Sequence, residues 1–79
     1  MTEIEPLTIG ITLKQRREEL GLSLPAIAEK TRIRANFLLD MEADRFDGFP
    51  GDAYLLGFLK LYAETLGLDA ASVIDQFRA

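Results

Sequence analysis

Hydrophobic side chains recur every three or four residues through most of the chain, which is the spacing of amphipathic helices. No segment alternates convincingly between apolar and polar residues, as a half-buried strand would. Glycine, proline and helix-capping residues separate the periodic stretches. The pattern therefore predicts an all-α fold, a compact bundle of five short helices, at residues 12–21, 23–31, 35–44, 51–67 and 70–78.

Cap residues predict where several of these helices begin. Thr12 and Gln15 have the spacing of a capping box, so the first helix is expected to begin at Thr12. Residues 1–10 lack helical periodicity and are predicted to form a flexible N-terminal arm, which leaves residues 11–79 as the folded domain. Side chains suited to cap later helices are Ser23 and Asp69.

The segment between Gly51 and Gly67 is apolar on more than one side, and no side chain from 53 to 59 is charged. One stripe is predicted to face the core: Leu55, Leu59, Tyr62 and Leu66. A neighbouring stripe, about 100° away, holds residues 54, 58, 61 and 65. A helix that is apolar all round is covered on more than one side. The second stripe therefore packs either against a partner protein or under the last helix, through Val73, Ile74 and Phe77.

Composition argues against an enzyme or a metal protein. The chain has 79 residues, no cysteine and no histidine, which removes disulfides, thiolate chemistry, the commonest general base and the commonest metal ligand. An acidic run at positions 40, 42, 44 and 47 lacks the spacing of a cation-binding loop and is interpreted as a solvated helix end. We expect no catalytic residues, no metal and no cofactor.

No apolar run approaches the roughly 20 residues of a membrane span, so this segment is expected to make no membrane contact itself. The acidic N-terminus also lacks the basic start of a signal peptide. The predicted location is cytoplasmic.

The stretch "LKQRREELGLSLPAIAEKTRIRANFLLDMEADR", residues 13–45, resembles the helix-turn-helix of the Cro/repressor superfamily. In that resemblance, Arg17 and Glu42 fall at positions that pair across helices, which predicts a structural ion pair. Ala28 lies where the two motif helices cross, where only a small side chain fits. The apolar and small positions that carry the likeness are Leu13, Leu20, Leu22, Ile27, Ala28, Ile33, Leu38 and Met41.

DNA-binding members of that superfamily read bases with side chains at the start of the second and third helices. Here Leu24 and Leu39 offer no hydrogen bond, and Asp40 would face phosphates. The net charge is −4, and residues 46–79 carry five acidic but only two basic side chains. DNA is therefore a disfavoured partner, and a sequence-specific regulator remains the alternative. The residues that would bind DNA are Lys30, Arg32, Arg34 and Asn36.

The following segment, "FPGDAYLLGFLKLYAETLGLD", is similar to the one that follows the helix-turn-helix in RodZ-like proteins, a family of bacterial cell-shape proteins. With it the resemblance covers about residues 11–78 and makes the domain a helix-turn-helix with two additional C-terminal helices. The family's pattern falls on Pro50, Gly51, Tyr54, Gly57, Phe58, Leu59, Tyr62, Ala63, Leu66, Gly67 and Leu68.

This resemblance implies a non-enzymatic interaction domain that binds the actin-like filament protein MreB. The family's contact uses two aromatic positions of the fourth helix, which are Tyr54 and Phe58 here. Leu61 shares their stripe, and Asp52 is expected at the rim of the contact. RodZ-like proteins carry such a domain before a single membrane span, so the resemblance implies the cytoplasmic face of the inner membrane if the chain is part of a longer protein.

Overall fold

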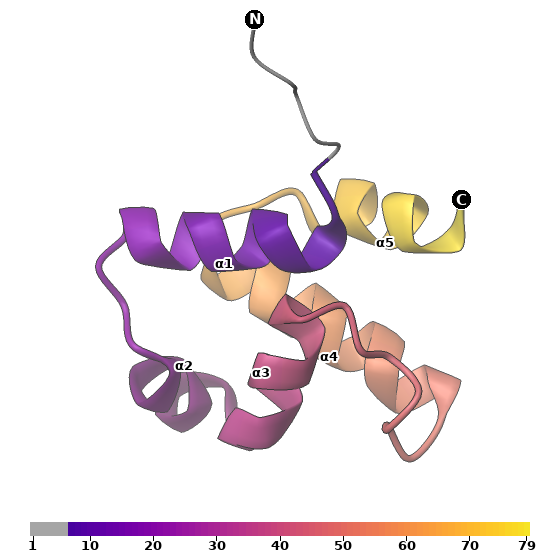
Figure 1. Ribbon diagram of the computed structural model, residues 1–79, viewed down its shortest axis with the longest axis horizontal. Helices are drawn as coiled ribbons and strands as arrows, with labels where there is room; N and C mark the ends of the chain where they lie inside the picture. The colour runs from indigo at the N-terminus through magenta and orange to yellow at the C-terminus, as the bar shows by residue number, and fades with distance from the viewer. Residues whose placement is uncertain (1–6) are drawn as a thin grey trace, which may run out of the picture.

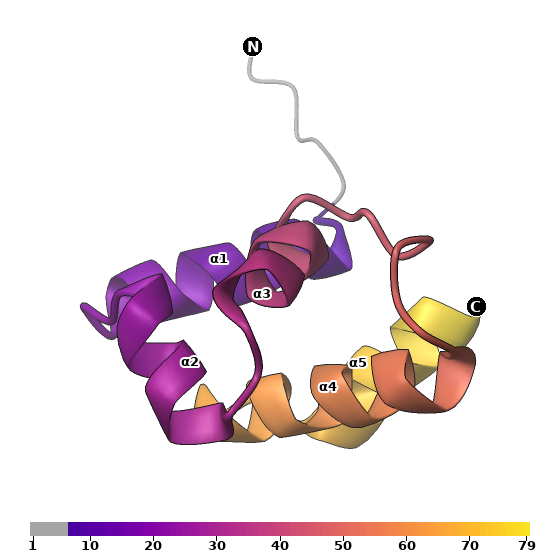
Figure 2. The same ribbon diagram turned by 90° about the horizontal axis from the view of Figure 1, so that it is seen from below.

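Five helices and no strand make up residues 7–79, the part of the chain that the computed structural model describes (Figure 1), which confirms the all-α prediction. Two layers are visible in Figure 2, with α1 beside α3 in one and α4 beside α5 in the other. Helix α2 contacts α3 and α4 at one end, and the loop of residues 43–51 crosses between the layers at the other. The helices are α1 (Ile9–Glu19), α2 (Leu24–Thr31), α3 (Ala35–Glu42), α4 (Asp52–Thr65) and α5 (Ala70–Arg78).

Helix α1 begins at Ile9, three residues before the predicted Thr12, and the capping-box prediction was wrong. The true cap is Thr8, whose Oγ1 accepts a hydrogen bond from the Ile11 N–H at 3.1 Å. Ile9 and Gly10 are buried helical residues and not part of an arm, because a cap that starts the helix earlier brings them into the domain. Of the other residues of the predicted arm, 7 and 8 precede the helix. Residues 1–6 lie outside the described part of the chain.

Other helix ends follow their local sequence. The Ser23 hydroxyl accepts from the Ala26 N–H at 3.2 Å, and the Asp69 carboxylate accepts from the Ala71 N–H at 3.1 Å. The residue after the α4 C-cap is Gly67, which has the left-handed φ of +75° that ends helices. These predicted boundaries are confirmed, whereas α3 ends two residues earlier than expected, at Glu42.

The core lies between the two layers. The predicted inner stripe of α4 is almost completely buried, with Tyr62 and Leu59 fully so. It packs in one cluster with side chains of the first three helices and the turns between them, chiefly Leu13, Ile27, Ile33, Leu38 and Met41. The repeating stripe of one long helix therefore holds the helix-turn-helix together and fixes which side of α4 faces outward.

Candidate functional site

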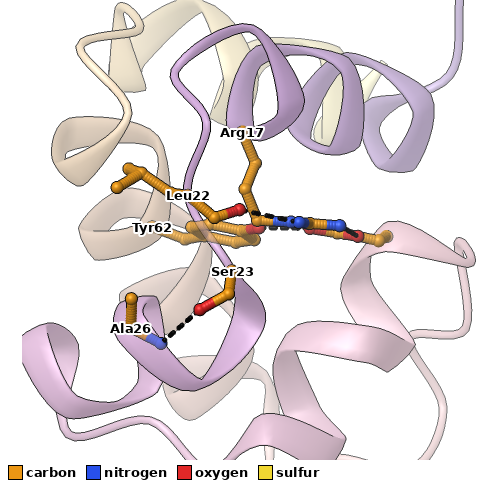
Figure 3. A network of polar contacts seen from close by, with 6 residues as sticks. Arg17, Leu22, Ser23, Ala26 and Tyr62 are labelled. Carbon is orange, nitrogen blue, oxygen red and sulfur yellow. Dashed lines mark hydrogen bonds and ion pairs between the residues drawn. The ribbon is translucent and has the colours of Figure 1, made fainter.

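A buried polar triad fixes α4 against the helix-turn-helix. The Arg17 guanidinium makes a bidentate ion pair with Glu42, from Nε to Oε2 at 2.7 Å and from Nη2 to Oε1 at 3.0 Å. Its remaining nitrogen, Nη1, donates to the Leu22 carbonyl oxygen at 2.9 Å, and the Tyr62 hydroxyl donates to Glu42 Oε2. Figure 3 shows Arg17 and the Leu22 carbonyl converging next to Tyr62. The predicted Arg17–Glu42 partners thus form a three-helix junction.

The electrostatics of this triad are those of a closed structural network. Glu42 is only 8% exposed, and its carboxylate receives three hydrogen bonds from side chains. The hydrogen bond to Glu42 raises the pKa of Arg17 above its ordinary value. Burial, reinforced by the bond to Glu42, raises the pKa of Tyr62 above its ordinary value. The polar groups of Arg17 and Glu42 are hydrogen-bonded to each other, to Leu22 and to Tyr62. The geometry of this network therefore sets the position of α4.

The outward face of α4 carries the largest exposed aromatic residue. Tyr54 is 59% exposed and Leu61 is 39% exposed, while Phe58 between them is only partly exposed. The Phe58 ring lies 5.6 Å from that of Phe37 and 6.1 Å from that of Phe49, between ring centroids. The structure therefore brings Tyr54, Phe58 and Leu61 together on one face, but backs Phe58 with rings from α3 and the 43–51 loop. Asp52, the fourth predicted contact residue, lies two residues before Tyr54 and so on a different side of α4.

Helix α5 packs against α4 but leaves Tyr54 and Leu61 exposed. Val73 is buried, and Phe77 stacks edge-on against Phe46 at 5.2 Å between centroids. The rings around Phe58 come instead from Phe37 and Phe49. The alternative that the last helix covers the second stripe is thus wrong for Tyr54 and Leu61, which stay exposed.

Gly57 lies on this exposed side of α4, where a Cβ added to it would meet no atom within 4 Å. Gly10 differs, since a Cβ there would collide with the backbone of Glu42. A glycine inside a helix costs about 1 kcal/mol relative to alanine. We find no neighbour in the described structure that requires glycine at position 57.

The surface corresponding to the DNA-reading face is mixed in character. Two apolar side chains, Leu24 and the 50%-exposed Leu39, line a hollow of about 330 Å³ beside Lys14. The predicted DNA-binding residues follow one another around the α2–α3 turn, all exposed: Lys30, Arg32, Arg34 and Asn36. Within residues 7–79 none of these four side chains makes a hydrogen bond or an ion pair. They are available to phosphates.

Sequence reasoning missed a second hollow, of about 580 Å³, between the end of α4 and α5. Its floor includes Leu68 and Ile74, and its rim includes Lys60, Glu64 and Asp75. These residues come together only because α5 folds back along α4, and no local pattern predicts that crossing. In the described part of the chain, no three acidic side chains gather closely enough to hold a metal ion. Similarly, none of the five helices has the length and apolar character needed to span a membrane.

Comparisons with known proteins agree on the fold of this chain. A family model described as a helix-turn-helix domain matches residues 12–73. The cytoskeleton protein RodZ of Streptococcus pneumoniae (strain ATCC BAA-255 / R6) is 42% identical over 77 residues, which are 98% of this chain and 28% of that protein. The chain therefore spans little more than a quarter of the length of this relative.

One solved structure is similar to this chain over most of the length of both. It is YmfM from Staphylococcus aureus, described as a candidate DNA-binding membrane protein. The TM-score is 0.82 at 33% identity, and the match covers 87% of this chain and 84% of that one. The two relatives thus share one fold and carry descriptions that point to different partners.

Proposed function

Since the chain belongs to the helix-turn-helix domain family, we propose that it uses this fold as a protein-interaction domain that docks on filaments of the actin-like protein MreB. The observation that carries the proposal is the exposed aromatic Tyr54 on the outer face of α4. Likeness to a protein named for the cytoskeleton supports a cytoskeletal partner. The proposed location is the cytoplasm, at the inner face of the membrane if the chain is part of a longer protein.

The docking mechanism follows from how α4 is held. The triad and the inner stripe fix the helix, so Tyr54 is presented from a rigid element and little backbone entropy is lost on binding. Phe58 lies beside it, with 6.2 Å between the two ring centroids, and is itself supported by Phe37. Aromatic anchors of this kind commonly dominate binding at protein interfaces. Asp52 is exposed at the start of α4, where it suits the polar rim of the contact.

The proposal includes no catalytic role. The two relatives and the family model are described as a cytoskeleton protein, a candidate DNA-binding protein and a helix-turn-helix domain, and these descriptions name no reaction. The polar triad is satisfied internally. We therefore assign the function to surface contacts alone.

A co-sedimentation assay with polymerised MreB tests the proposal. We expect the wild-type domain to pellet with filaments and Tyr54→Ala to remain in the supernatant with its circular dichroism unchanged. Leu20→Ala is the control, because Leu20 is an exposed leucine at the C-cap of α1, and it should still pellet. A folded wild-type domain that stays in the supernatant would disprove the filament proposal.

Comparing Phe58→Ala with Tyr54→Ala separates a loss of filament binding from a loss of stability. Because Phe58 is partly buried among other rings, we expect this variant to lose both filament binding and about 1–3 kcal/mol of stability. Tyr54→Ala should lose binding with a change in stability of roughly 0.5 kcal/mol or less. Urea unfolding of both variants provides the comparison.

DNA binding is the second candidate, favoured by the exposed cations around the α2–α3 turn and by the description of YmfM. Under this alternative, Arg34 and Asn36 approach bases while Lys30 and Arg32 contact phosphates. A duplex shifted by the wild-type domain at physiological salt, with no pelleting by filaments, would favour it over docking.

A further inference from the structure

The loop of residues 43–51 joins α3 to α4 and is held against several helices as it crosses between the layers (Figure 2). Near its start, Asp44 accepts two hydrogen bonds from the beginning of α1. The Phe46 ring packs edge-on against Phe77 of α5. In the second half of the loop, the ring of Phe49 contacts α3 and α4 instead. The two aromatic residues of the loop therefore have different neighbours.

Phe49 fills the space between α3 and the outer side of α4. Its ring centroid lies 5.0 Å from that of Phe37 on α3 and 6.1 Å from that of Phe58 on α4. Phe58 also contacts Tyr54, with 6.2 Å between centroids and 60° between the ring planes. Three rings thus restrict the side chain of Phe58, and Phe49 is linked to Tyr54 through it.

The start of α4 has little support from capping. Its N-cap is Gly51, and no side chain makes a cap hydrogen bond there. Tyr54 is the third residue of the helix, and Leu55 anchors the inner side of the same turn in the core. An apolar residue that precedes an N-cap and packs on the helix fixes the angle at which the chain enters it. Phe49, two residues before the cap, packs on Phe58 and so supports the outer side.

We propose that Phe49 is a positioning residue of the filament contact, because it holds Phe58, and through it Tyr54, in the conformation that the partner binds. This inference rests on the proposed docking function and deepens it, since it assigns the support of the contact to a loop residue outside α4. A ring that is already ordered loses less side-chain entropy on binding. Without Phe49, Phe58 gains conformations that it must give up again on the filament.

Phe49→Ala and Phe46→Ala form a matched pair, since each removes one half-buried ring from the same loop. Of the two rings, that of Phe49 is the one that packs on Phe58. Both variants should have a lower thermal midpoint, by about 5–15 °C. Below both midpoints, co-sedimentation with polymerised MreB should weaken by about two- to tenfold for Phe49→Ala and stay unchanged for Phe46→Ala. Phe49→Tyr, which keeps the ring, should bind as wild type does.

Aromatic NMR of the free domain adds a readout that needs no filament. The chain has only two tyrosines, so labelled tyrosine reports Tyr54 beside Tyr62. A reoriented Phe58 ring changes the shielding of the Tyr54 ring next to it. The Tyr54 resonances should therefore move in Phe49→Ala and stay in place in Phe46→Ala.

Wild-type filament binding by a folded Phe49→Ala domain would overturn the inference and leave the docking proposal intact, and so would unmoved Tyr54 resonances. Equal losses of binding in Phe49→Ala and Phe46→Ala would trace the effect to stability and overturn it as well. If Phe49→Ala does not fold, Phe49→Leu takes its place with the same two expectations, because leucine keeps much of the apolar volume without the ring. A wild-type domain that does not pellet with filaments would overturn both proposals.

Discussion

Tyr62 joins the buried ion pair to α4 through a single hydroxyl group. The ring is fully buried, and its O–H donates to a carboxylate that also receives two bonds from Arg17. A hydrogen bond to a charged group contributes more than one between neutral groups, and its loss leaves an acceptor with one fewer donor. The phenol is therefore a point of alignment between α4 and the helix-turn-helix.

Tyr62→Phe should destabilise the domain by about 1.5–3 kcal/mol, because it removes the hydroxyl and keeps the ring. Urea unfolding followed by circular dichroism measures the change. Tyr54→Phe is the matched control, since that ring is 59% exposed and its hydroxyl makes no hydrogen bond within the described chain. Equal midpoints for the two variants would show that the Tyr62 hydroxyl adds nothing.

The same residue makes stability depend on alkaline pH. Burial raises the pKa of Tyr62 above the ordinary value of 10.0, so between the unfolded and folded pKa values the folded state holds the proton that the unfolded state has released. Stability from this group is complete below pH 10 and is lost as pH rises further. Unfolding midpoints between about pH 8 and pH 11 should fall more steeply for wild type than for Tyr62→Phe. Parallel curves would contradict this assignment.

At the scale of elements, the start of α1 depends on a residue far along the chain. Asp44 accepts hydrogen bonds from the Thr8 hydroxyl at 2.6 Å and from the Gly10 N–H at 2.9 Å, and so ties the first turn of α1 to the end of α3. Asp44 also has a φ of +59°, which an aspartate tolerates better than most residues. The helix therefore begins where Asp44 satisfies the free N–H of Gly10 and holds the capping Thr8.

Asp44→Ala should cost about 1–2 kcal/mol and fray the first turn of α1, because two hydrogen bonds are lost and alanine tolerates positive φ poorly. Hydrogen exchange of the amides of residues 10–12 would report the fraying directly. Asp47→Ala, at a nearby exposed position, should leave both the exchange and the stability unchanged. Unaltered protection in the Asp44 variant would show that Thr8 alone caps the helix.

These cases show what could be predicted from the sequence and what could not. Periodicity and local caps such as Ser23 and Asp69 act within a few residues, so the helices and most boundaries could be read from the chain. The pairing of Thr8 with Asp44 spans 36 positions and has no local pattern. The same holds for the Phe37, Phe49 and Phe58 cluster, which half-covers a predicted anchor. The exposure of Tyr54 could be predicted from its place on the second stripe, whereas the open space beside Gly57 required the structure.

For the whole molecule, charge is unevenly distributed along the chain. Residues 46–79, which include α4 and α5, carry five acidic and only two basic side chains. Three cations that make no ion pair within residues 7–79, Lys30, Arg32 and Arg34, lie around the α2–α3 turn. A long-range field that attracts nucleic acid needs a basic surplus, and a net charge of −4 opposes it.

Duplex DNA should accordingly bind this domain only at low salt. Neutralising about three phosphates with Lys30, Arg32 and Arg34 gives a slope near −2.7 for log K against log salt, so affinity should fall roughly fortyfold between 50 and 200 mM salt. Fluorescence anisotropy of a labelled duplex measures this slope. Arg34→Ala should make the slope shallower by about 0.9, which is the contribution of one phosphate contact. Leu24 and Leu39 have no side-chain hydrogen-bonding group with which to tell bases apart, so unrelated duplexes should give the same curve. Tight binding to one sequence at 150 mM salt would instead show that Asn36 and Arg34 read bases, and would make DNA the partner of this fold.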